Sequence, residues 1–137
     1  MKFVHLFETK KKQTRGLTIA YECKRRLGDH DLAFYDVKCG VAYCAPVEQN
    51  YSRHMGRTIS SNRLTCSKNL KPMFHFEIVV SDMDMEGAGM ECLVILALRE
   101  QIVHRRDWWP LDLIDSNLIQ WTEKRQEMLQ NLVMQGV

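Results

Sequence analysis

Residues 35–64, YDVKCGVAYCAPVEQNYSRHMGRTISSNRL, contain the change of periodicity that decides the fold. Up to Tyr43, apolar side chains stand at every second position, which is the pattern of a half-buried strand. After Pro46, which suits the first turn of a helix, apolar residues recur every four positions, at Val47, Tyr51, Met55 and Ile59. This spacing is typical of an amphipathic helix. We therefore predict a strand over residues 33–43 and a helix that begins near Pro46 and ends near Leu64.

The flanking sequence supplies the other elements of the fold. Residues 17–23 alternate in the same way and are followed by a polar loop containing Gly28, so a β-hairpin is predicted over residues 17–43. Residues 74–80 alternate as well and predict a third strand. The apolar stretch 90–103 predicts a buried helix. A final helix is predicted over residues 116–135, with an apolar stripe of Leu118, Trp121, Met128, Leu129, Leu132 and Val133.

These elements define an α+β fold class. We expect a small antiparallel sheet, made of the hairpin and the third strand, packed against the amphipathic helix, with a helical C-terminal region. The chain of 137 residues is 45% hydrophobic and 26% charged, which is ordinary for a globular protein and excludes intrinsic disorder. This length predicts a single domain over residues 1–137.

The cysteines and the N-terminus indicate a reducing compartment. The five cysteines are an odd number, and the first fifteen residues lack the apolar stretch of a secretory signal. Reduced thiols in the cytoplasm are therefore expected. The longest apolar run, residues 92–98, is too short to cross a bilayer, so no membrane association is predicted.

The formal net charge of +2 conceals an asymmetry. Residues 1–72 hold 14 Lys and Arg against 6 Asp and Glu, a net charge of +8, whereas residues 73–137 hold 5 against 11, a net charge of −6. A basic half indicates phosphate groups or an acidic partner. The acidic half is also available to pair with the basic half.

Part of the positive charge falls on one predicted helix. Arg53 and Arg57 are four residues apart and share a helix face, and Arg63 lies near the end of the same helix. Guanidinium groups bind phosphate oxygens bidentately and stay charged at any relevant pH. The pair is therefore predicted to bind a phosphate or a diphosphate. The alternative is a solvated helix face that forms ion pairs with the acidic C-terminal half.

Two adjacent tryptophans, Trp108 and Trp109, are the second candidate feature. Indole rings stack on nucleobases, which makes the pair a candidate for base binding. Adjacent side chains in an extended segment point in different directions. We therefore expect one Trp in the core or at an oligomer interface, and the other open to a ligand.

Known catalytic and metal-binding motifs are absent from the sequence. There is no P-loop, no Gly-x-Gly-x-x-Gly motif and no nucleophile elbow. The acidic stretch 82–87 resembles the start of a calcium loop, but the twelfth position, Leu93, lacks the required Glu. No Cys-x2-Cys pair exists, and Cys39 and Cys44 fall on opposite faces of a strand. The chain is predicted to be no enzyme and to hold neither a metal nor a cofactor.

The order of residues within 35–64 carries a resemblance. A strand ending in Gly-Val-Ala-x-Cys-x-Pro leads into a helix that contains Tyr-Ser-Arg-x-x-Gly-Arg and closes with Arg-Leu. This order resembles the anti-Thoeris sponge proteins of phages, of the first type described. The resemblance implies a homo-oligomer that sequesters cyclic ADP-ribose isomers or cyclic oligonucleotides without degrading them. It carries over to Arg53, Gly56, Arg57 and Arg63.

Two classes of function follow from the sequence. The first is a phage counter-defence protein, in the cytoplasm of the host cell, that binds a cyclic nucleotide-type immune signal through Arg53, Arg57 and Arg63. A Trp or Tyr at a subunit boundary, with Trp108 and Trp109 as the candidate tryptophans, would stack the base. The alternative is a phage protein that inhibits a host enzyme or defence protein by direct binding, or that binds nucleic acid through the basic helix.

Overall fold

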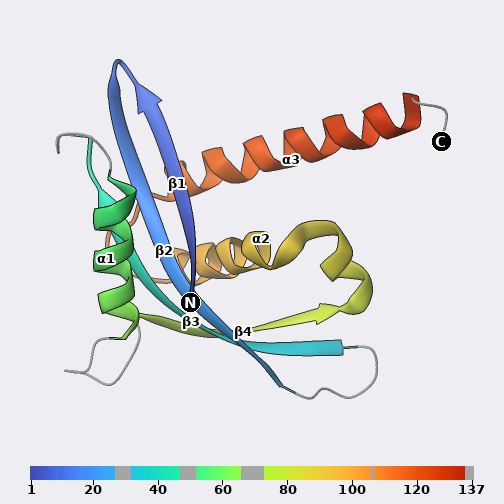
Figure 1. Ribbon diagram of the computed structural model, residues 1–137, viewed down its shortest axis with the longest axis horizontal. Helices are drawn as coiled ribbons and strands as arrows, with labels where there is room; N and C mark the ends of the chain where they lie inside the picture. Colours follow the sequence, from blue (N-terminus) through green and yellow to red (C-terminus); the bar gives the residue numbers. More distant parts are fainter. Residues whose placement is uncertain (27–31, 47–51, 66–72, 106, 135–137) are drawn as a thin grey trace.

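The computed structural model describes residues 1–26, 32–46, 52–65, 73–105 and 107–134 (Figure 1). Its four strands form one antiparallel sheet in the order β1-β2-β3-β4, which confirms the α+β class. The strands and helices in chain order are β1 (Lys2–Lys10), β2 (Gln13–Arg26), β3 (Leu32–Cys44), α1 (Arg53–Leu64), β4 (Phe74–Ser81), α2 (Asp82–Val103) and α3 (Leu111–Met134).

The helices divide between the two faces of the sheet. α1 lies against one face of β2 and β3, on the left of Figure 1, while α2 and α3 lie on the opposite face. The strand side chains that point toward α2 and α3 form the main core with them. Its fully buried members include Leu6, Leu17, Ile19, Val37, Val41, Ile95, Leu98, Leu113 and Ile114. Among the helices of the described residues, none is long and apolar enough to cross a membrane.

The predicted contact face of α1 is wrong by one position. Met55 and Ile59, expected to face the sheet, are 55% and 36% exposed. The buried residues are Gly56, Ser60 and Leu64, which keep the same four-residue spacing. The hydrophobic pattern was misleading because small residues, rather than large apolar ones, fill the contact with the sheet. Val47 and Tyr51 lie outside the described residues.

The start of α1 also differs from the prediction. The helix begins at Arg53 rather than near Pro46, and Ser52 is its N-cap. The Ser52 hydroxyl accepts a hydrogen bond from the backbone N–H of Met55, at 3.3 Å. This cap satisfies one of the N–H groups that the first turn leaves without a helical partner.

Two glycines allow α1 to lie directly on the sheet. A Cβ atom built on Gly40 of β3 would lie 2.1 Å from the carbonyl oxygen of Ser60 and 2.4 Å from the backbone nitrogen of Leu64. A Cβ on Gly56 of α1 would lie 2.2 Å from the Thr18 hydroxyl oxygen of β2. The distance between helix and sheet therefore depends on the absence of a side chain at both positions.

The remaining elements agree with the sequence in part. The hairpin is confirmed as β2 paired with β3, and the third strand as β4. The loop predicted between the hairpin strands lies largely outside the described residues. The helix predicted over residues 90–103 is the second part of α2, which has a non-helical Gly89 at φ 73°. α3 begins at Leu111, five residues before the prediction, and Leu118 and Trp121 of its predicted stripe are half-buried.

β1 was not predicted from the sequence. This strand carries large side chains on both faces, with Phe3, His5 and Phe7 on the side of α1 and Val4 and Leu6 in the main core. Because apolar residues stand on both sides, the alternation that reveals a half-buried strand is weak there. β1 is joined to β2 by a tight turn.

That turn consists of Lys11 and Lys12, with φ angles of 51° and 66°. Positive φ at both central residues is the geometry of a type I′ hairpin turn, for which Asn-Gly is strongly preferred. An L-amino acid with a full side chain is disfavoured in this conformation. The turn therefore uses two residues that suit it poorly.

Substitution of Gly40 tests the close contact between α1 and the sheet. We expect Gly40→Ala to lower the free energy of unfolding by about 3 kcal/mol, the upper end for an overpacked site, because both blocking atoms belong to the backbone. Gly56→Ala would meet the Thr18 hydroxyl oxygen at 2.2 Å and the Thr18 Cβ at 2.9 Å, so it should also destabilise. It should cost less than Gly40→Ala, because Ala is the better helix former by about 1 kcal/mol. Urea unfolding measures both values, and a Gly40→Ala variant as stable as the parent would contradict the packing.

Substitution of the turn residues tests the strained hairpin. We expect the double variant Lys11→Asn, Lys12→Gly to raise the free energy of unfolding by about 1 kcal/mol, because Asn-Gly adopts positive φ readily. Val at both positions should lower it, since a β-branched residue is strongly disfavoured there. Thermal unfolding of the three proteins gives the order, and the same stability for all three would exclude a type I′ turn.

Candidate anion-binding site

Arg53 and Arg57 of α1 lie along the aromatic side chains of β1. The centre of the Arg53 guanidinium group lies 5.9 Å from the centre of the Phe7 ring. The corresponding distance from Arg57 to the Phe3 ring is 5.8 Å. Both separations allow a cation–π attraction. The Phe7 ring is 48% exposed, so this surface combines two cations with an accessible aromatic ring.

His5 lies between the two phenylalanines and holds Arg57. Arg57 Nε donates a hydrogen bond to His5 Nε2, at 3.2 Å. Because Nε2 accepts, the proton of the neutral ring is on Nδ1, which donates to the Thr18 hydroxyl oxygen at 3.0 Å. Burial lowers the pKa of His5, and the charges of Arg57 and Arg53 lower it further. The ring is therefore held neutral and orients one edge of the Arg57 guanidinium group.

The positive charge of this pair is not neutralised in the described part of the chain. No carboxylate there lies within ion-pair distance of Arg53 or Arg57. The expected alternative, ion pairs between this helix face and the acidic C-terminal half, is therefore not found among these residues. The acidic side chains pair elsewhere, as Asp112 with Arg15, Asp115 with Arg99, Glu77 with Arg26 and Asp107 with Arg105.

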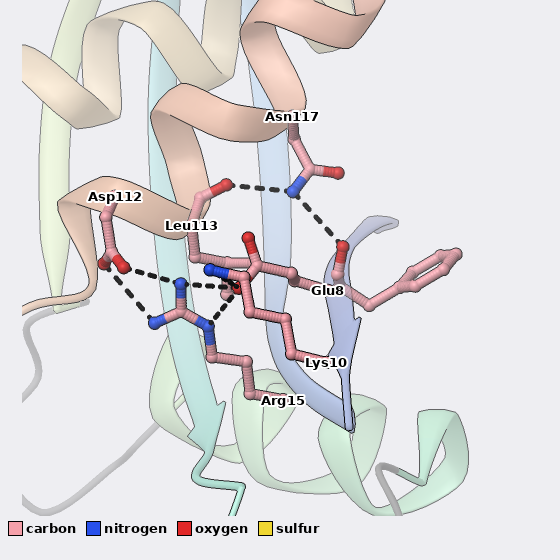
Figure 2. A network of polar contacts seen from close by, with 7 residues as sticks. Glu8, Lys10, Arg15, Asp112, Leu113 and Asn117 are labelled. Carbon is pink, nitrogen blue, oxygen red and sulfur yellow. Dashed lines mark hydrogen bonds and ion pairs between the residues drawn. The ribbon is translucent and has the colours of Figure 1, made fainter. Parts of the chain in front are cut away.

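Glu8, the carboxylate of β1, points to the opposite side of the sheet. Figure 2 shows it with Arg15 of β2, whose guanidinium group also binds Asp112 at the start of α3. The distances from Arg15 Nη2 are 3.0 Å to Glu8 Oε1 and 2.6 Å to Asp112 Oδ2. The hydrogen bond between Arg15 and Asp112 raises the pKa of Arg15 and lowers the pKa of Asp112. This network ties α3 to the hairpin and keeps the carboxylates away from Arg53 and Arg57.

Arg63, the third predicted phosphate ligand, has a different environment. Its Nη1 donates a hydrogen bond to the carbonyl oxygen of Val41, at 2.7 Å. β4 does not reach this point, because its pairing with β3 ends at Cys39 and Phe74. Arg63 thus binds β3 beyond the last residue pair that β3 and β4 form in the described part of the chain. Ten residues separate it from Arg53, about 15 Å along the helix, so the structure does not bring it into the same cluster.

Trp108 and Trp109 belong to the other side of the sheet. The Trp109 ring packs edge-on against Phe74, at 5.5 Å between ring centres, and is half-buried against the core. The Trp108 ring is 68% exposed and packs edge-on against Tyr43, at 5.3 Å. Tyr43 contacts the core on the face opposite α1, so neither indole meets Arg53 or Arg57 within one chain.

The described residues form neither a metal-binding cluster nor a second anion-binding site. No three His, Cys, Asp or Glu side chains gather there closely enough to hold a metal ion. A hollow of about 820 Å³ lies over residues 21–24 and 35–38, lined by lysines and carboxylates together. Lys24 and Lys38 stand there beside Glu22 and Asp36, so both signs of charge are present.

Sequence reasoning missed the residues that complete the site. Phe3, His5 and Phe7 were not considered because β1 was not recognised as a strand. Their spacing of two positions was the available signal, since it places all three on one face. No protein-family model, curated protein or solved structure matches the chain. The site is therefore interpreted from its own geometry.

The neutral His5 predicts a pH dependence of stability. The unfolded state binds a proton at the ordinary histidine pKa of about 6.5, and the folded state does so only at lower pH. The contribution of neutral His5 to the free energy of unfolding should therefore be complete above about pH 6.5. It should be lost as the pH falls toward the pKa of His5 in the folded state.

Urea unfolding across this pH range, on the parent and on His5→Gln, measures the effect. The variant should have a flatter profile between about pH 6.5 and 5. His104→Gln removes an exposed histidine at the end of α2 and serves as the control. A His5→Gln profile that falls as steeply as that of the parent would contradict the assignment.

Proposed function

We propose that this protein binds an anionic nucleotide-type ligand without transforming it, and that Arg53 and Arg57 hold its phosphate. The observation that carries the proposal is the pair of guanidinium groups over the Phe7 and Phe3 rings, with no carboxylate in ion-pair distance among the described residues. An unneutralised pair of arginines on a rigid helix attracts and orients phosphate oxygens.

The spacing of the pair suits one phosphate or two adjacent ones. Residues four apart on a helix have Cβ atoms about 5–6 Å apart, so two guanidinium groups can bind oxygens of the same group. The hydrogen bond from Arg57 to His5 uses only Nε, which leaves the Nη atoms for the ligand. Phe7, the exposed ring beside Arg53, would stack a base.

The ligands to test first come from the resemblance of residues 35–64 to the sponge proteins. They are cyclic ADP-ribose isomers and cyclic oligonucleotides, bound as immune signals by a phage protein in the host cytoplasm. In this proposal the protein sequesters the signal as a homo-oligomer and does not cleave it. Arg63 supports the site indirectly, because its hydrogen bond to Val41 fixes the far end of α1 on β3.

Isothermal titration with these ligands tests the proposal. We expect Arg57→Ala and Arg53→Ala each to weaken binding about 10- to 100-fold, the usual loss for one charge-assisted hydrogen-bonding group of about 1.5–3 kcal/mol. Arg25→Ala removes the same charge from an exposed position near the end of β2 and should bind as the parent does.

Two results would refute this function. One is the absence of heat from every nucleotide with the parent protein, and the other is unchanged binding by Arg57→Ala. A second experiment identifies the molecules that copurify with the protein from host cells. A stoichiometric protein partner in place of a released nucleotide would favour inhibition of a host protein.

A further inference from the structure

The β1–β2 hairpin carries positive charge beyond the end of α1. In Figure 1 the hairpin extends past the N-terminal end of this helix. Lys11 and Lys12 form its tip, are exposed, and form no ion pair within the described residues. The neighbouring Lys10 differs, because its Nζ lies 3.6 Å from Glu8 on the other side of the sheet.

The tip is continuous with the Arg53–Arg57 site along one face of the hairpin. Below the tip, the hydroxyl groups of Thr9 and Thr14 are hydrogen-bonded to each other at 2.9 Å. Phe7, His5 and Phe3 follow at every second position of β1, beside the two arginines. From Phe3 to Lys11 the chain makes eight steps of roughly 3.3 Å, so this surface is about 26 Å long.

We name this surface, from Phe3 to the Lys11–Lys12 tip with Arg53 and Arg57 beside it, the β1 track. It is bounded by cations and carries aromatic rings and hydroxyl groups, while Glu8 points to the opposite face. A positively charged track with rings at intervals is the arrangement that binds single-stranded nucleic acid, since every base presents a face for stacking. Lysines in a turn that favours Asn-Gly also indicate that charge, rather than turn stability, is required at the tip.

We infer that the β1 track binds a linear single-stranded oligonucleotide several nucleotides long. Phosphates would contact Arg57, Arg53 and the tip lysines in turn, and bases would stack on Phe7 and on the guanidinium groups that lie over the rings. The inference rests on the proposed function at Arg53 and Arg57 and names a longer ligand for the same site. A mononucleotide or a small cyclic nucleotide would leave Lys11 and Lys12 without a phosphate.

Fluorescence anisotropy with labelled single-stranded DNA and RNA of about 2 to 12 nucleotides tests the track. We expect affinity to rise with length for the parent protein. Four phosphate contacts predict a slope of log K against log salt concentration of about −3, at about −0.7 for each contact. Comparison of the DNA and RNA series shows which of the two phosphate backbones the protein prefers.

The variant Lys11→Asn, Lys12→Gly removes two charges and leaves residues that suit the turn. It should bind the longest oligonucleotides about tenfold more weakly, with a salt slope smaller by about 1.4, and bind dinucleotides as the parent does. The control Lys24→Gln, Lys124→Gln removes the same charge from exposed positions outside the track and should bind as the parent does. Arg57→Ala should weaken binding at every length.

The outcomes separate the track from the site beneath it. If long and short oligonucleotides bind equally, with no effect of the tip substitutions but a loss in Arg57→Ala, the track is overturned and the nucleotide site stands. Unchanged binding by Arg57→Ala at every length overturns the nucleotide site. Absence of binding by all oligonucleotides overturns the track, and titration with cyclic nucleotides then decides the site by itself.

Discussion

The direct contact between α1 and the sheet determines where every other feature of the candidate site lies. Gly40 and Gly56 remove the side chains that would otherwise separate the helix from β2 and β3. At this short distance, the exposed arginines on the neighbouring helix face lie within cation–π distance of the aromatic rings of β1. A wider separation would keep the same sequence on the helix but would part the guanidinium groups from the aromatic rings.

The candidate site lies on the face of the sheet opposite the main core. On the side of α2 and α3, apolar side chains form the core, and carboxylates pair with Arg15 and Arg99 at its margin. On the side of α1, the contact is made by small residues, and Arg53 and Arg57 have no carboxylate partner among the described residues. Two carboxylates that share the α1 face, Asp36 and Glu77, pair with Arg26 rather than with Arg53 or Arg57.

Patterns of hydrophobicity predicted the elements that bury large side chains on one face. β2, β3, β4 and the last part of α2 were found because their alternation or apolar length is unambiguous. The same reasoning failed where packing uses small residues or both faces of a strand. Gly56 and Ser60 carry no hydrophobic signal, so the stripe of Met55 and Ile59 was chosen instead, and β1 was overlooked. Arg53 and Arg57 were identified from their spacing, but their aromatic partners required the tertiary structure.

Helix packing and the proposed ligand site are joined through one side chain. Gly56 packs against Thr18, whose hydroxyl oxygen also accepts the hydrogen bond from His5. His5 in turn accepts from Arg57, so the orientation of the proposed phosphate ligand depends on the contact that holds the helix against the sheet. Order established on folding need not be established again when a ligand binds, which reduces the entropic cost of binding. Arg57 is therefore held in place before any ligand binds, whereas Lys11 and Lys12 are exposed and form no ion pair within the described residues.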